Sequence, residues 1–187
     1  MDIQKVGPEE GRQSGGRMKW TKQLPTIATV LLLAFAAWRL VPLYLGHSPE
    51  QVDVHGMRLE HLDGTPVAPA AIRGKALVVN FWAPWCPPCR IETPWLEKLQ
   101  RRDAGRLVVV GVVADPTEYE HAQSLMRQKG ITYLLVRDSA DVRAAFGEIS
   151  VLPTSFYVTP TGRVVHTTRG LVPEPLMRLF AHQAIHG

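Results

Sequence analysis

The chain has 187 residues, 45% of them hydrophobic, which is enough for one domain with a substantial core and one further segment. Its formal net charge of +4 is modest. Part of the basic excess lies in residues 1–22, and later basic residues alternate with acidic ones, as in residues 97–103. Because a nucleic-acid-binding protein needs a clustered basic face or a recognisable reading motif, the composition argues against that class.

Residues 23–45 form an apolar stretch in which Arg39 is the only charged residue. A helix of about 23 residues is long enough to cross a hydrocarbon core of roughly 30 Å. Trp38 and Tyr44 stand where interfacial aromatic residues are expected, and lysine and arginine are more frequent before the stretch than directly after it. The pattern predicts a single-pass anchor in the cytoplasmic (inner) membrane, with residues 1–22 as a cytoplasmic tail and the C-terminal domain in the periplasm.

A cleaved signal peptide is the alternative interpretation of the same stretch. Lys19 and Lys22 would then form the basic region, residues 24–33 the apolar core, and residues 34–36 the small-x-small cleavage site. A buried core helix is disfavoured because the apolar residues show no amphipathic pattern. Both remaining interpretations export the rest of the chain, which we divide into a polar linker at 46–53 and a domain at 54–187.

The domain is expected to begin with a short hairpin or strand, followed by alternating strands and helices. The evidence for this first element is a turn at residues 63–66 preceded by the apolar residues Val54, Met57, Leu59 and Leu62. The later expected elements are a buried strand at 77–82, a helix with Ile91, Trp95 and Leu99 at four-residue intervals, a buried strand at 107–113, a helix at 118–129, a strand at 131–136, a helix at 140–146, strands at 155–159 and 163–168, and a helix at 174–186. This order predicts an α/β sandwich with a mixed sheet.

Cys86 and Cys89 are the only cysteines, and they form a CxxC motif between the first buried strand and the helix. A structural zinc site would need about four ligands, and the sequence offers neither a second CxxC nor a pair of histidines close behind Cys89. Cys86 is expected at the helix start, where unpaired N–H groups and the macrodipole favour a thiolate, and Pro87 suits the first helical position. Cys89, one turn further on, would be the more buried, resolving thiol. A purely structural disulfide is the alternative, although so short a loop constrains the unfolded chain little.

Residues 80–90, which read Asn-Phe-Trp-Ala-Pro-Trp-Cys-Pro-Pro-Cys-Arg, and the later Pro94 resemble the active-site segment of the thioredoxin fold. Glu92, together with Asn80 in place of the buried aspartate of cytosolic thioredoxins, is similar to the exported, membrane-tethered TlpA/ResA-like branch. Residues 149–154 and 162–165 resemble that family's cis-proline loop and closing hairpin. Residues 148–170 are most similar to suppressor-of-copper-sensitivity D-type members. The resemblance covers residues 52–187 and implies a thioredoxin-like three-layer sandwich with a central mixed sheet, preceded here by one N-terminal transmembrane helix.

The resemblance also implies a substrate-binding surface around the cysteine pair. It places a cis peptide bond between Leu152 and Pro153, facing the cysteines and presenting backbone to an extended substrate segment. Thr154 would complete this segment, and Trp85 and Pro87 would contact the substrate from the other side. A proline that opens an edge strand is the alternative for Pro153.

Glu92 lies one helical turn after Cys89 and is the candidate proton acceptor for the thiols, or a group that shifts their pKa values by coupled titration. Because Asn80 cannot titrate, Glu92 has to supply any buried acid of the site. The alternative is an ordinary exposed helix residue. Trp82 and Trp85 are expected to pack around the site rather than to take part in catalysis.

The sequence therefore predicts an exported thiol-disulfide oxidoreductase with Cys86, Cys89, Glu92 and Pro153 as its catalytic residues. Its partners would be periplasmic protein thiols and disulfides, and we favour their reduction, in cytochrome c maturation or copper-stress repair, with a membrane electron donor of the DsbD/CcdA type. An oxidase or isomerase of the same fold, or a copper-binding or assembly module, is the alternative. Histidine and methionine are scattered, so no metal is expected, and nothing indicates a nucleotide, haem or flavin cofactor. CxxC proteins span about 150 mV, so the motif leaves the direction of electron flow open.

Overall fold

The computed structural model describes residues 27–36, 50–54 and 56–187, and contacts divide the chain into two units, residues 1–41 and 42–187. Residues 27–36 of the first unit form a helix with exposed side chains. The predicted tail at 1–22, the remainder of the predicted anchor at 23–45, and residues 46–49 of the predicted linker lie outside the described residues. Within the described ranges, no helix is both long and apolar enough to cross a membrane.

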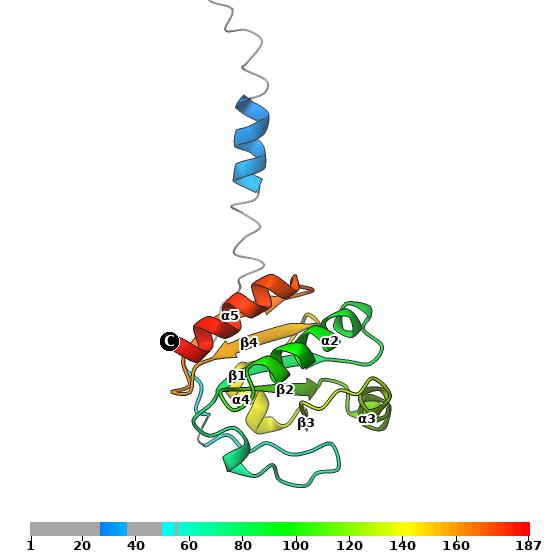
Figure 1. Ribbon diagram of the computed structural model, residues 1–187. Coiled ribbons are helices and arrows are strands. Elements are labelled where there is room, and N and C mark those ends of the chain that lie inside the picture. Colours follow the sequence, from blue (N-terminus) through cyan, green and yellow to red (C-terminus); the bar gives the residue numbers. More distant parts are fainter. Residues whose placement is uncertain (1–26, 37–49, 55) are drawn as a thin grey trace, which may run out of the picture. The chain divides into compact units, whose positions relative to one another are not determined.

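The second unit is built on a five-stranded mixed sheet in the order β3-β2-β1-β4-β5 (Figure 1). The strands are β1 (Ala76–Trp82), β2 (Leu107–Val113), β3 (Leu134–Arg137), β4 (Thr154–Val158) and β5 (Val164–Arg169). β1, β2 and β3 are parallel, whereas β4 runs antiparallel to β1 and to β5. Every residue of β1 and of β2 is buried, which explains why both strands are continuous apolar runs apart from Asn80 and Gly111.

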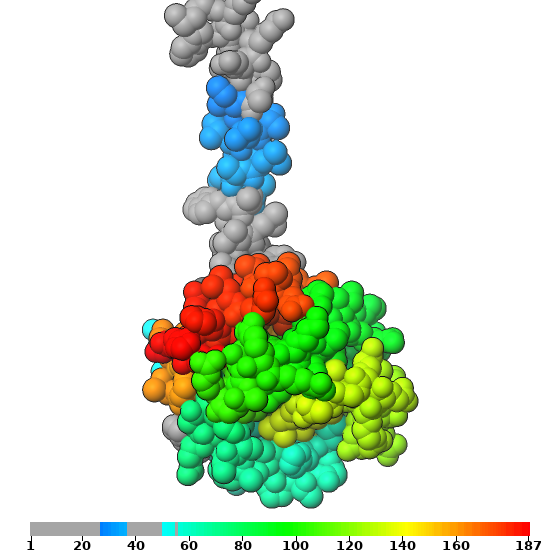
Figure 2. All heavy atoms as spheres, viewed as in Figure 1, coloured from blue at the N-terminus to red at the C-terminus, as the bar shows by residue number. Residues whose placement is uncertain are grey.

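Helices cover both faces of this sheet. They are α2 (Pro87–Arg102), α3 (Tyr119–Gln128), α4 (Ala140–Phe146) and α5 (Glu174–His186), with short 3-10 helices η2 (Pro69–Ala71) and η3 (Pro116–Glu118). Alternate residues of β1 enter two separate cores: Val78 and Trp82 pack with residues of α2, α3 and α5, while Val79 and Phe81 pack with α4 and the segment before β1. α2 and α5 contact each other and are adjacent on the surface (Figure 2). The predicted three-layer arrangement is confirmed.

Several elements have the predicted bounds, namely β2, α4 and α5, while the third strand begins later than expected. Residues 131–133 do not join the sheet, because the backbone N–H of Thr132 donates to the Glu97 carboxylate (2.8 Å). The segment before β1 contains isolated bridges, Gln51 to Arg163 and Glu60 to Pro66, in place of the expected hairpin or strand. The turn at 63–66 is present, with the Asp63 carboxylate accepting the N–H of Thr65 (2.9 Å).

The helix predicted from the spacing of Ile91, Trp95 and Leu99 is present as α2, and that spacing coincides only in part with the face that the helix buries. Ile91 is 47% exposed, and the helix buries a face whose members are Cys89, Glu92, Thr93, Leu96, Glu97 and Leu99. Three of these six side chains are polar and are hydrogen-bonded inside the protein, so hydrophobic spacing alone does not identify the whole buried face. This face matters for function, because it carries Cys89 and Glu92 together.

Candidate active site

Cys86 is the N-cap residue of α2 and is joined by a disulfide to Cys89, with 5.3 Å between the two Cα atoms. Its carbonyl accepts the N–H of Arg90 (3.2 Å), and its own N–H donates to the carbonyl of Ala83 (3.1 Å). The predicted position of Cys86 at the helix start is therefore confirmed. The expected difference in burial is absent in this disulfide form, since Cys86 is 3% and Cys89 is 2% exposed.

Two consecutive prolines occupy the first two positions of α2 after Cys86, namely Pro87 and Pro88. Neither has a backbone N–H, so Cys89 is the first residue of the helix that carries one. A thiolate at Cys86 would thus be stabilised by the helix dipole and by few backbone donors. This proline pair distinguishes the electrostatics of this CxxC motif from those of a helix that presents N–H groups from its first residue.

The peptide bond between Leu152 and Pro153 is cis, as the resemblance implied. Thr154 follows as the first residue of β4 and pairs with Phe81 near the end of β1, the end from which the chain leads to Cys86. Leu152 packs against the core cluster that contains both cysteines. The edge-strand alternative for Pro153 is wrong, because β4 has hydrogen-bonded neighbours on both sides.

The two tryptophans near the cysteines have different environments. Trp82 is 1% exposed and packs as predicted; its indole lies over Gly111, where an added Cβ would come within 3.1 Å of Trp82 Nε1. Trp85 is 58% exposed, so the packing prediction for this residue is wrong. Its Nε1 donates to Asp115 Oδ2 (3.3 Å), which ties the residue before Cys86 to the start of η3.

Glu92 lies on the buried face of α2, three residues after Cys89, and is only 1% exposed, so the exposed-helix alternative is wrong. Its Oε2 accepts from Asn80 Nδ2 (3.4 Å), and its Oε1 accepts the backbone N–H of Val172 (3.2 Å). Asn80 Nδ2 also donates to Ser155 Oγ (2.9 Å). Burial raises the pKa of Glu92 to about 7, and the hydrogen bonds from Val172 and Asn80 oppose this rise only in part.

The sequence interpretation missed three residues that support the site: Asp115, Ser155 and Val172. In the sequence Asp115 stands in an Asp-Pro-Thr turn before a helical stretch, and its capping pattern with Thr117 gives no sign of a contact to Trp85. Ser155 and Val172 reach Asn80 and Glu92 only through strand register and the path of a loop. Within the described residues, no three or more His, Cys, Asp or Glu side chains are grouped so as to hold a metal ion.

A CxxC disulfide at a helix start, a cis-proline segment at the same end of the sheet and a buried carboxylate on the same helix are the parts of a thioredoxin-like redox site. The chain is a thiol-disulfide oxidoreductase with a thioredoxin-like fold. It belongs to the Redoxin family, which matches residues 48–179.

Curated relatives and solved structures are consistent with the TlpA/ResA-like branch of this fold. The chain is 29% identical over 149 residues to "Thioredoxin-like protein YneN" of Bacillus subtilis, covering 75% of this chain and 85% of the relative. It is 30% identical over 125 residues to "Thiol-disulfide oxidoreductase ResA" of Halalkalibacterium halodurans, covering 65% of this chain and 69% of the relative. The crystal structure of a thioredoxin-family thiol:disulfide interchange protein from Chlorobium tepidum TLS has a TM-score of 0.60 at 27% identity, covering 75% of this chain and 98% of that one.

Proposed function

We propose that the chain exchanges disulfides with exported proteins through Cys86 and Cys89, acting as a reductase. The Cys86 thiolate attacks one sulfur of a substrate disulfide, forms a mixed disulfide and releases the other substrate sulfur as a thiolate, which takes up a proton. Cys89 then attacks Cys86 Sγ, the mixed bond breaks, and the second substrate thiol leaves. Two electrons pass to the substrate, and the enzyme is left with the Cys86–Cys89 disulfide. The observation that carries this proposal is that disulfide at the start of α2, next to the cis-Pro153 segment.

Glu92 acts as the proton acceptor for Cys89 in this scheme. The two residues are three positions apart on the buried face of α2, and both side chains are almost fully buried. A carboxyl group whose pKa is raised to about 7 can accept and release a proton near neutral pH. Asn80 donates to this carboxyl and is itself held by Ser155, and neither of these side chains titrates.

An extended substrate segment binds across the cysteine pair and the Pro153 segment. Leu152, Pro153 and Thr154 supply the backbone on one side, and Trp85 and Pro87 contact the substrate on the other. The 58% exposure of Trp85 supports this assignment, because a large exposed aromatic side chain next to the attacking sulfur is suited to contact with a partner.

The reductase direction and the setting rest on sequence features. The TlpA/ResA-like resemblance favours reduction of exported proteins, with cytochrome c maturation or copper-stress repair as the process and a DsbD/CcdA-type membrane donor returning the dithiol state. The similarity of residues 148–170 to D-type suppressors of copper sensitivity favours the second process. The apolar stretch at 23–45 supports tethering to the inner membrane, with the domain at 54–187 in the periplasm.

Cysteine variants of the full chain, expressed in a bacterial host, test the exchange reaction and the tether together. Cys89→Ser should accumulate mixed disulfides with other proteins, because Cys86 attacks but nothing resolves the product. Cys86→Ser is the matched control and should trap none. Non-reducing electrophoresis of separated membrane and soluble fractions reads both results. Equal trapping by the two variants would contradict the assigned roles, and soluble protein cleaved near Ala36 would reject the membrane anchor.

A further inference from the structure

We infer that the loop between β5 and α5, residues 170–173, is a positioning element that transmits the ionisation state of Glu92 to the Pro153 segment. The inference rests on the proposed function, since it concerns how the protein substrate is held during exchange. Within this loop, two backbone N–H groups that stand two residues apart bind two parts of the site that are distant in the sequence, Pro153 and Glu92.

The first contact joins the loop to the substrate-binding side of the site. The N–H of Gly170 donates to the carbonyl of Pro153 at 2.7 Å. Gly170 has a φ of +78°, a conformation that glycine adopts without steric cost, and it directly follows Arg169, which ends β5. The carbonyl of the cis-proline residue is thus held by the loop, and the loop position helps to set the position of Pro153.

The second contact joins the same loop to the buried acid. The N–H of Val172 donates to Glu92 Oε1 at 3.2 Å, and Val172 is 7% exposed whereas Leu171 is 38% exposed. The loop therefore lies at the surface at Leu171 and turns into the interior at the next residue, Val172. Glu92 is the side chain that accepts this N–H, so a change at its carboxyl group acts directly on the loop backbone.

Protonation changes the strength of this second contact. An N–H that donates to a charged carboxylate forms a stronger hydrogen bond than one that donates to a neutral acid. The titratable side chains that interact with Glu92 from other elements are Tyr133, before β3, and Tyr157 of β4. Burial raises the pKa of both phenols, so they stay protonated over the range in which Glu92 titrates. In the disulfide form, Cys86 and Cys89 do not titrate.

Ionised Glu92 therefore holds Val172 and, through the short loop, keeps Gly170 against Pro153. When Cys89 transfers its proton to Glu92 during exchange, the contact to Val172 weakens and the hold on the Pro153 segment loosens. The loop thereby links proton transfer in the interior to the binding of an extended substrate by the Pro153 segment. The substrate is bound more firmly before the proton transfer and is released more easily after it.

The first test follows backbone amides of the oxidised full-length chain in detergent micelles by NMR between pH 5 and 9. The chemical shifts of the Val172 and Gly170 amides should change with pH together, and their midpoint should equal that of the Glu92 carboxyl resonance. Both changes should vanish in Glu92→Gln. Gly162 is the control amide, because its N–H donates to the carbonyl of Thr159 in the β4–β5 turn and should not follow this titration. A Gly170 amide that does not follow Glu92, or that still titrates in Glu92→Gln, overturns the inference.

The second test compares two disulfide probes with the reduced enzyme: a mixed disulfide of thionitrobenzoate with a cysteine-containing decapeptide, and one with mercaptoethanol. The ionisation of the Cys86 thiol affects the rates of both probes. The rate with the peptide probe divided by the rate with the mercaptoethanol probe therefore reports how well the peptide is bound. The ratio should rise about fivefold from pH 5 to 9 in the wild type, a factor that matches about 1 kcal/mol between charged and neutral hydrogen bonds. It should stay flat in Glu92→Gln and in Val172→Pro, which removes the N–H donor.

The two probes separate this inference from the proposed function. If neither probe reacts with the reduced enzyme, the exchange function itself fails. If both react and the wild-type ratio is flat with pH, exchange stands and the role of the loop is overturned. Glu92→Gln keeps the test decisive should Val172→Pro fail to fold, because its side chain has nearly the same shape as the original and cannot ionise.

Discussion

Glu92 and Glu97 lie five positions apart on α2, and both are buried, with 1% and 6% of their surface exposed. Burial raises the pKa of Glu92, whose partners are one amide side chain and one backbone N–H. Burial would also raise the pKa of Glu97, but hydrogen bonds from Thr132 and Arg101 outweigh it and lower that pKa. Because Glu97 accepts from a cationic side chain and from two groups of Thr132, it stays ionised and serves the structure. Among the described residues, Glu92 has no such partners and can exchange a proton.

The raised pKa of Glu92 predicts a specific dependence of stability on pH. Between its ordinary pKa of 4.5 and about 7, the folded chain binds more protons at this site than the unfolded chain, so the free energy of unfolding falls as pH rises. Across this window we expect the oxidised wild type to lose about 3 kcal/mol relative to Glu92→Gln, from about 1.4 kcal/mol per pKa unit. Urea unfolding at a series of pH values measures the difference.

The control for this prediction is Glu120→Gln, on the exposed surface of α3, which should keep the wild-type pH profile. A constant offset between wild type and Glu92→Gln is expected from the altered hydrogen bonds. Parallel profiles with no change in that offset between pH 4.5 and 8 would show that Glu92 titrates normally in the folded chain.

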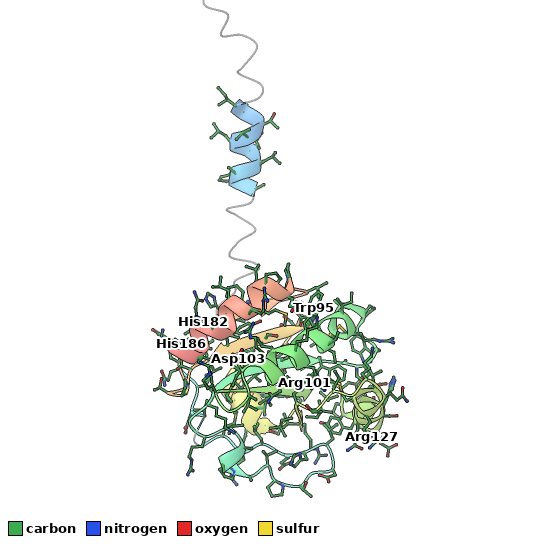
Figure 3. The ribbon with its side chains drawn as sticks, in the orientation of Figure 1. Trp95, Arg101, Asp103, Arg127, His182 and His186 are labelled. Atoms are coloured by element: carbon green, nitrogen blue, oxygen red, sulfur yellow. A yellow bond between two sulfur atoms is a disulfide. The ribbon has the colours of Figure 1, made fainter. Side chains whose placement is uncertain are left out.

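At the scale of elements, the Glu97 carboxylate fastens α2 to the segment that enters β3. It accepts the backbone N–H of Thr132 (2.8 Å), the Thr132 hydroxyl (2.8 Å) and Arg101 Nε (2.6 Å). Arg101 extends from α2 (Figure 3) and also donates to the carbonyl of Gly130 (3.1 Å). These contacts hold the helix that carries both cysteines against the segment that leads into β3.

Glu97→Gln should lower the free energy of unfolding by about 1.5 to 3 kcal/mol at pH 7, because the amide replaces a charged acceptor and its N–H₂ group faces other donors. Since the pKa of Glu97 is lowered, this contribution is present above the ordinary pKa of 4.5 and is lost as pH falls through the folded-state value. Urea unfolding at pH 7 and pH 3 measures both. A loss no larger than that of Glu120→Gln at pH 7 would show that the contacts contribute little.

Elements bounded by glycine, proline or polar turn residues were predictable from the sequence. Elements whose boundaries depend on side-chain contacts were not. β2, α4 and α5 have the predicted bounds because hydrophobic patterns end there at glycine, proline or polar turns. β3 starts late because Glu97, far away in the sequence, binds the backbone of Thr132. The polar part of the buried face of α2 was not predictable for a related reason, since Glu92 and Thr93 are buried with hydrogen bonds that hydropathy does not reveal.

At the scale of the whole molecule, the sequence located the chemical groups of the site but not the contacts that join them. The CxxC motif identifies Cys86 and Cys89, the family resemblance identifies Pro153, and the position one helical turn after Cys89 identifies Glu92. Their support depends on the antiparallel pairing of β4 with β1 and on the loop after β5, which bring Ser155 and Val172 to the interior. Such long-range register is decided by the packed fold and leaves no local signature.

The central claim is that Cys86 and Cys89 form a reversible redox couple that passes electrons to substrates. Equilibrating the full-length chain with glutathione buffers and quantifying the dithiol by alkylation gives its reduction potential. We predict reversible equilibration at a potential close to that of thioredoxin, about −270 mV. A potential near the DsbA value of about −120 mV would contradict the reductase assignment, and a disulfide that does not exchange with glutathione would contradict the claim as a whole.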